Sequence, residues 1–144
     1  KVRVLGDDLS TPKSQQPLLA LAQAANVEVR LFNPFCCGRD GFVSRFLASP
    51  QEIGRLNHRM HNKLFIADGV VAVVGGRNIA DEYFVLSEAQ NFIDMDALVV
   101  GKVVAELEAI FDEYWNAEQV WPIAEIVRGP GGRKPGADEF DARV

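Results

Sequence analysis

The stretch that decides the fold is Leu64-Phe65-Ile66-Ala67-Asp68-Gly69-Val70-Val71-Ala72-Val73-Val74. Two apolar runs, rich in β-branched residues, flank an Asp-Gly pair, and this pattern is the strongest short-range signal of a β-hairpin. If Asp68 and Gly69 form a two-residue turn, Ala67 pairs with Val70 and the register continues back along both strands. The sequence therefore predicts an antiparallel hairpin here.

Further regular elements are predicted on both sides of this hairpin from the spacing of apolar residues. They are strands over 2–6, 27–31 and 92–100 and helices over 17–25, 42–47, 78–84 and 102–116. The first strand, helix and strand form a βαβ unit, which favours parallel pairing. The last helix carries an amphipathic stripe of aliphatic and aromatic residues that predicts core packing. The predicted fold class is α/β, a mixed β-sheet flanked by helices.

Length and composition limit the classes of protein. The chain has 144 residues, 48% hydrophobic and 24% charged, with a formal net charge of −5. These values fit about one globular domain and exclude a disordered tail or a coiled coil. The acidity argues against a globally basic nucleic-acid binder, so no nucleic-acid partner is expected. The longest apolar run, residues 70–74, is too short to span a bilayer, and the adjacent Cys36 and Cys37 are expected to be free thiols.

The charge balance inverts around the only two histidines of the sequence, His58 and His61. The charged residues from 55 to 77 are Arg55, Arg59, Lys63, Asp68 and Arg77. An acidic chain that gathers cations at one place is suited to bind an anion there. In an extended segment residues two apart share a face, so His61 and Lys63 are expected to point the same way.

The predicted register also indicates what faces this pair. It sets Lys63 opposite Val74 and His61 opposite Gly76. A glycine opposite the histidine leaves an open volume above the sheet, and its neighbour Gly75 and the nearby Asn78 offer amide donors to whatever fills it. An imidazole, an ammonium, an amide and a vacant volume suit a phosphoryl group.

These residues match a known signature. His61-x-Lys63-x4-Asp68-x6-Gly75-Gly76-x-Asn78 resembles the His-Lys-Asp motif of the phospholipase D superfamily. Residues 56–63, 74–84 and 91–101 are similar to its bacterial cardiolipin synthase branch. The resemblance covers residues 1–123 and implies a phospholipase D-like half-domain, incomplete at its N-terminus, with residues 124–144 as a linker-like tail.

The resemblance implies a two-step phosphodiester transfer through a phosphohistidine, with no cofactor. The histidine of one motif attacks phosphorus, and the histidine of a second motif protonates the departing alkoxide and then deprotonates the incoming water or alcohol. The catalytic residues that it implies are His61, Lys63, Asn78 and Asp94, and the substrate-binding residues are Gly75, Gly76, Arg59 and Arg77. His61 is then the nucleophile or the acid/base, Asp94 orients its ring, and Asp68 has a structural role in the turn.

Simpler interpretations stand beside several of these roles. Asp94, and Asp96 on the same face, could be solvated carboxylates at a strand edge. Arg59 and Arg77 could equally contact a lipid phosphate or be solvated. A zinc site at His58-x-x-His61 has no third ligand at a usable spacing, so no metal is expected.

A complete site of this superfamily needs two motifs, and the sequence contains one His-x-Lys. The second motif is expected from the rest of a longer parent chain or from a homodimer, and the chain alone is expected to be nearly inactive. For the parent, the resemblance implies a place at or near the cytoplasmic face of the bacterial inner membrane; the fragment itself is expected to be soluble.

Three functions remain open on the sequence. The first is phosphatidyl transfer between phospholipids, as in a cardiolipin synthase. The second is hydrolysis by a lipase or a nuclease of the same superfamily, although the net charge of −5 argues against a nuclease. The third is a non-catalytic phospholipid-binding module, against which the intact motif argues.

Overall fold

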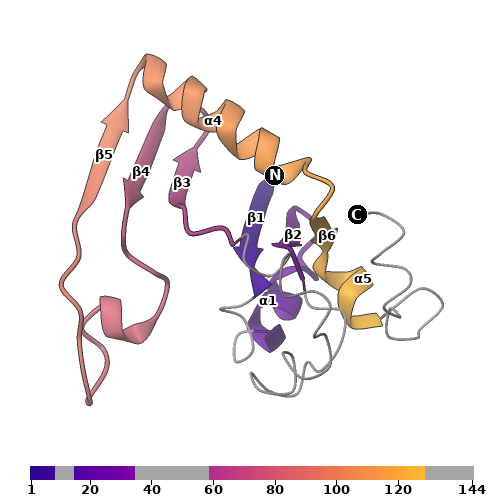
Figure 1. The fold of residues 1–144 in the computed structure, drawn as a ribbon, viewed down its shortest axis with the longest axis horizontal. Helices are drawn as coiled ribbons and strands as arrows, with labels where there is room; N and C mark the ends of the chain where they lie inside the picture. The colour runs from indigo at the N-terminus through magenta and orange to yellow at the C-terminus, as the bar shows by residue number, and fades with distance from the viewer. Residues whose placement is uncertain (9–14, 35–58, 129–144) are drawn as a thin grey trace. The chain divides into compact units, whose positions relative to one another are not determined.

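The computed structural model of the protein describes residues 1–8, 15–34 and 59–128, which fall into two compact units. Unit 1 comprises Lys1–Met60 and Tyr114–Val144, and unit 2 comprises His61–Glu113. Figure 1 shows the elements: strands β1 (Val2–Asp7), β2 (Val27–Phe32), β3 (Lys63–Ala67), β4 (Val71–Gly75), β5 (Asp96–Val100) and β6 (Val120–Pro122), helices α1 (Gln15–Leu21), α4 (Lys102–Trp115) and α5 (Ile123–Arg128), and the 3₁₀ turn η3 (Asp81–Tyr83). The mixed α/β class predicted from the sequence is confirmed.

Unit 1 is built on a three-stranded mixed sheet of order β1-β2-β6. β1 pairs with β2 in parallel, from Val2 opposite Val27 to Asp7 opposite Phe32. The predicted βαβ unit is thus confirmed, although α1 is shorter than the predicted helix because it ends at Leu21.

The core of unit 1 extends past the predicted end of the domain. Ile123 and Ile126 of α5 are 1% and 2% exposed and pack with Val29 and Leu31 of β2. β6, which pairs antiparallel with β2, leads directly into this helix. Residues 124–128 therefore belong to the fold of unit 1 and not to a linker, and the rest of the predicted tail, 129–144, lies outside the described residues.

Unit 2 is built on an antiparallel sheet of order β3-β4-β5, and the predicted hairpin is its first two strands. Asp68 and Gly69 have φ of 53° and 66°, and the amide of Val70 donates to the carbonyl of Ala67 at 3.0 Å. Two successive positive φ values make a type I′ turn, as Asp-Gly predicts.

The predicted register of the hairpin is wrong by one residue. The ladder pairs Ala67 with Val71 and Lys63 with Gly75, so Lys63 does not lie opposite Val74. Val70 closes the turn on Ala67 but does not pair in the ladder, which makes it an extra residue of the bulge type. One inserted residue shifts every later pair, and the predicted pairing of His61 with Gly76 fails for the same reason.

Several elements are also shorter, or less buried, than the sequence predicts. The helix predicted over 78–84 is only the 3₁₀ turn η3, and the strand predicted over 92–100 begins at Asp96. In α4, Val104 is fully buried, whereas Val103 and Ile110 of the predicted core stripe are partly exposed. No helix in residues 1–8, 15–34 and 59–128 is long and apolar enough to cross a membrane. The predicted helix over 42–47, the two cysteines and His58 lie outside the described residues.

Candidate functional site

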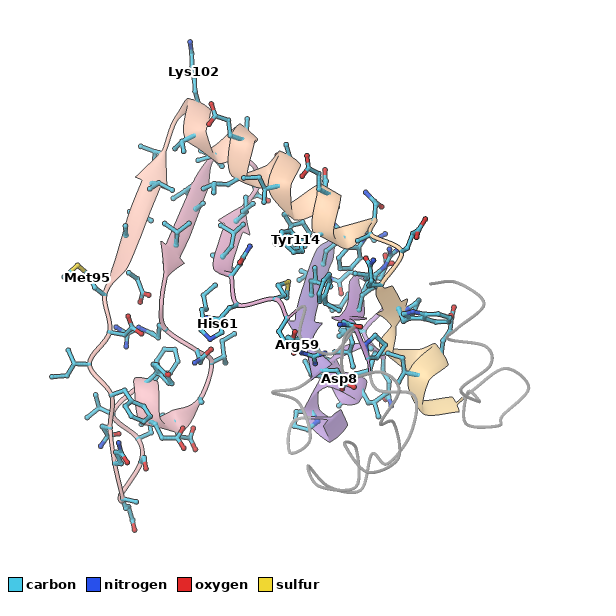
Figure 2. All side chains as sticks on the ribbon, viewed as in Figure 1. Asp8, Arg59, His61, Met95, Lys102 and Tyr114 are labelled. Atoms are coloured by element: carbon cyan, nitrogen blue, oxygen red, sulfur yellow. The ribbon has the colours of Figure 1, made fainter. Side chains whose placement is uncertain are left out.

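His61 lies where the chain enters β3 (Figure 2), and the structure brings it together with Lys63, the first residue of that strand. The Lys63 Nζ lies 2.8 Å from the His61 Nδ1 and donates to the His61 carbonyl oxygen at 2.7 Å. The imidazole is exposed and the lysine is half-buried. The prediction that the two side chains share a face is confirmed.

This contact determines what the imidazole can do. An ammonium carries only donors, so the Nδ1 of a neutral His61 accepts from it and the ring proton resides on Nε2. In this tautomer Nε2 is a hydrogen-bond donor and not a base or a nucleophile. Attack on phosphorus by Nε2 requires the other tautomer, with an acceptor facing Nδ1. In the arrangement seen here, the contact with Lys63 therefore selects the ring tautomer that carries its proton on Nε2.

The space above the two glycines at the end of β4 is filled, which corrects the vacant volume predicted from the sequence. A Cβ on Gly76 would lie 2.6 and 2.7 Å from the carboxylate oxygens of Asp94. A Cβ on Gly75 would meet a carboxylate oxygen of Asp96 and, at 2.8 Å, the carbonyl oxygen of Met95. Gly75 and Gly76 thus admit two acidic side chains against the sheet.

Arg77 holds this acidic segment in place. Its Nε donates to the Asp96 carboxylate at 2.6 Å and one Nη donates to the Asp94 carbonyl at 3.1 Å. The other Nη donates to the Tyr83 carbonyl, and the guanidinium lies over the Phe84 ring, 5.7 Å from its centroid. Every nitrogen of its head group therefore has a protein acceptor, and 30% of the side chain is exposed.

The other expected catalytic groups of unit 2 are not joined to His61 by hydrogen bonds. Asp94 accepts from the amide of Met95 at 2.7 Å, and within the described residues no bond links it to the imidazole. Asn78 is exposed, and its carbonyl accepts from Ala80 at 3.1 Å. Asp68 is exposed in the turn, at the opposite end of the hairpin from His61.

Arg59 belongs to unit 1 and has a different environment from the one expected. Its guanidinium pairs with Asp7 at 2.9 Å and donates to the Asn33 carbonyl at 2.9 Å, and only 15% of the side chain is exposed. The amide of Met60 donates to the same Asp7 carboxylate at 3.0 Å. Arg59 therefore joins the segment that precedes His61 to the ends of β1 and β2.

The carboxylates that bind the two arginines, Asp96 and Asp7, are not predicted from the sequence. Asp96 was considered only for sharing a face with Asp94, whereas the ladder places it beside Gly75, which pairs with Lys63 on the other side. Asp7 stands at the end of a predicted strand, where a buried acid needs a basic partner. The sequence shows an acidic residue at the end of each of these strands, but it does not show which basic residue pairs with it.

Comparison with known proteins identifies the family. Residues 1–115 match the family model described as the phospholipase D-like domain of cardiolipin synthase. The chain is 40% identical to cardiolipin synthase C of Escherichia coli strain K12 over 142 residues, which are 99% of this chain and 29% of that protein. It is 34% identical to a cardiolipin synthase of Geobacillus thermodenitrificans, over 91% of this chain and 26% of that protein.

These matches agree with the resemblance inferred from the motif. A cardiolipin synthase of Oceanobacillus iheyensis is 30% identical over 81% of this chain and 22% of its own length. The chain thus spans between a fifth and a third of the length of these relatives. On the family model and the motif together, the chain belongs to the phospholipase D-like domain family of the cardiolipin synthases.

Proposed function

We propose that this chain supplies one half of a phosphatidyl-transfer site that works through a phosphohistidine. The observation that supports it most is the exposed His61 imidazole in contact with the Lys63 ammonium, in a chain of the cardiolipin synthase domain family. A phosphodiester needs a cation for its non-bridging oxygens and an imidazole for proton or phosphoryl transfer, and the pair offers both.

Each proposed role follows from the contacts. Lys63 neutralises charge on the phosphate, and His61, as the imidazolium, gives its Nε2 proton to the departing alkoxide and returns to the neutral imidazole. When the phosphate draws the Lys63 ammonium away, Nδ1 takes up a proton from solvent, and the resulting imidazolium donates its Nδ1–H to a carboxylate, for which Asp94 is the candidate. Asn78, exposed two residues after Gly76, donates its amide to the phosphate. Asp68 is structural.

Arg59 and Arg77 are left out of the proposed phosphate ligands. Both guanidinium groups are already held by carboxylates and carbonyls of the protein. Recruiting either one would break these bonds, and a charged hydrogen bond is worth about 1.5–3 kcal/mol. Each of them holds chain segments of its own unit together.

The proposed reaction also needs a second motif, from another copy of this chain or from further sequence of a longer protein. Phosphatidylglycerol is the proposed donor, and a second phosphatidylglycerol the acceptor. Because these substrates are lipids, the proposed site of action is the cytoplasmic face of the bacterial inner membrane.

The experiment incubates the chain, over a range of concentrations, with phosphatidylglycerol vesicles and separates the products. Cardiolipin and glycerol indicate transfer, and phosphatidic acid indicates hydrolysis. If two copies form the site, the rate per chain rises with concentration. His61→Ala is expected to lower the rate by at least about a hundredfold, and Lys102→Met, an exposed lysine of the same unit, is the matched control.

Two results would contradict the proposal. A His61→Ala variant that retains the wild-type rate removes both roles considered for the imidazole. Binding of phosphatidylglycerol without any product, at every concentration and in the presence of a relative's second motif, indicates the non-catalytic binding module.

A further inference from the structure

Unit 2 is strongly acidic, and an acidic side chain close to Lys63 would pair with its ammonium. It carries three basic side chains against ten acidic ones. A lysine that binds phosphate must not be neutralised by a neighbouring carboxylate, because the carboxylate then competes with the phosphate. Among the described residues of unit 2, one acid shares a row of the sheet with Lys63.

That acid is Asp96. In the ladder Lys63 pairs with Gly75, and Gly75 pairs with Asp96, so the three residues form one row on one face of the sheet. The middle residue has no side chain, and the Asp96 carboxylate leans over it. Adjacent strands are about 4.8 Å apart, so this carboxylate stands roughly one strand spacing from the backbone of Lys63.

Arg77 prevents the encounter. Its Nε holds the Asp96 Oδ2 at 2.6 Å, while its two Nη atoms are anchored on the carbonyls of Tyr83 and Asp94. The arginine is thus fixed at three points and keeps the Asp96 carboxylate in an ion pair of its own. Lys63 instead contacts His61 through its Nδ1 and its carbonyl.

We propose that Arg77 is a positioning residue that sequesters Asp96, so that the Lys63 ammonium stays available to an anionic ligand. Arg77 acts through Asp96 and need not touch the ligand. The identity of that ligand as a phosphodiester rests on the proposed function; the sequestration itself does not.

The first test needs no ligand. The folded chain is treated with a trace of an acylating reagent, and the acylation rates of Lys63 and Lys102 are measured by peptide mass mapping. An ammonium paired with a carboxylate acylates more slowly. In Arg77→Gln the freed Asp96 pairs with Lys63, and the Lys63 rate is expected to fall about two- to fivefold, the range of an exposed ion pair. Lys102, on α4, is the internal reference and keeps its rate.

A second substitution separates sequestration from a general structural role. In the double variant Arg77→Gln/Asp96→Asn the competing carboxylate is gone, so the Lys63 rate returns to the wild-type value or above it. If Arg77 only supported the segment that contains Tyr83 and Asp94, removing the Asp96 carboxylate as well would not restore the acylation rate of Lys63. An unchanged or increased Lys63 rate in Arg77→Gln, or a decrease that Asp96→Asn does not reverse, overturns the proposal.

The same variants then test the link to phosphate. The dissociation constant of glycerophosphoglycerol, the deacylated headgroup of phosphatidylglycerol, is expected to rise about two- to fivefold in Arg77→Gln and to recover in the double variant. If the acylation pattern holds but no variant binds glycerophosphoglycerol, sequestration stands and the proposed function fails. If binding is tight in every variant, Asp96 does not compete with the phosphate and the proposal fails.

Discussion

The two adjacent glycines at the end of β4 should differ sharply in their tolerance of a methyl group. A Cβ on Gly75 would lie 2.8 Å from the Met95 carbonyl oxygen and 2.9 Å from the Asp96 Cα, and both are backbone atoms that cannot move away alone. A Cβ on Gly76 would meet only the Asp94 side chain, whose carboxylate can rotate. The substitutions Gly75→Ala and Gly76→Ala are therefore a matched pair.

The expected magnitudes follow from these contacts. Forcing a methyl group against the β5 backbone costs about 1–3 kcal/mol of unfolding free energy. Replacing glycine by alanine also restricts the unfolded chain, which returns about 0.5–1 kcal/mol. Gly75→Ala is thus expected to destabilise the protein by about 1–2 kcal/mol, and Gly76→Ala to be nearly neutral. Urea denaturation followed by circular dichroism measures both values.

Double variants test the reasoning further. Removing the carboxylate in Gly76→Ala/Asp94→Ala should abolish whatever cost Gly76→Ala shows. Removing it in Gly75→Ala/Asp96→Ala should leave most of the cost, because the backbone contact remains. Equal destabilisation by the two single variants, or full recovery in the second double variant, would refute the close approach of β5 to Gly75.

Three further predictions concern the remainder of the structure. Leu31→Ala removes a fully buried side chain from the core of unit 1 and should lower the unfolding free energy by about 2–5 kcal/mol, measured by urea denaturation. Asp68 has a φ of 53°, so Asp68→Asn should be tolerated whereas the β-branched Asp68→Val should cost about 1–3 kcal/mol in the same assay. The side-chain hydrogen bonds from Arg30 and then Lys1 hold the pKa of Glu28 below its ordinary value of 4.5, so the ionised carboxylate stabilises the fold above that value and this contribution is lost as the pH falls below it. The difference in unfolding free energy between the wild type and Glu28→Gln should therefore shrink from about pH 6 to pH 3, and a constant difference would contradict the pairing.

The elements of this fold were predictable where their signals are local. The Asp-Gly turn, the parallel pairing of β1 with β2 and the long helix α4 all follow from neighbouring residues. The register of the hairpin does not follow from neighbouring residues. The Asp-Gly turn is the same whether or not Val70 pairs, and Val70 is left out of the ladder. β6 has three residues, too few to show a period, and its position depends on pairing with β2.

In the candidate site too, contacts between near neighbours in the sequence were predictable and contacts between distant residues were not. His61 and Lys63 stand two residues apart, so their contact could be predicted from strand geometry. Arg77 reaches Asp96 across 19 residues and Arg59 reaches Asp7 across 52, and no local pattern pairs them. The structure gives each arginine acidic and carbonyl partners that lie far away in the sequence.

The central claim is that His61 and Lys63 together form a phosphodiester site. Its most direct test is a titration of the chain, labelled with ¹³C in its histidines, with glycerophosphoglycerol, in which the His61 ring signals report binding. The account predicts that these signals shift, that Lys63→Met weakens binding about ten- to a hundredfold, and that Lys102→Met leaves it unchanged. Unshifted His61 signals, or equal affinity in Lys63→Met and the wild type, would contradict it.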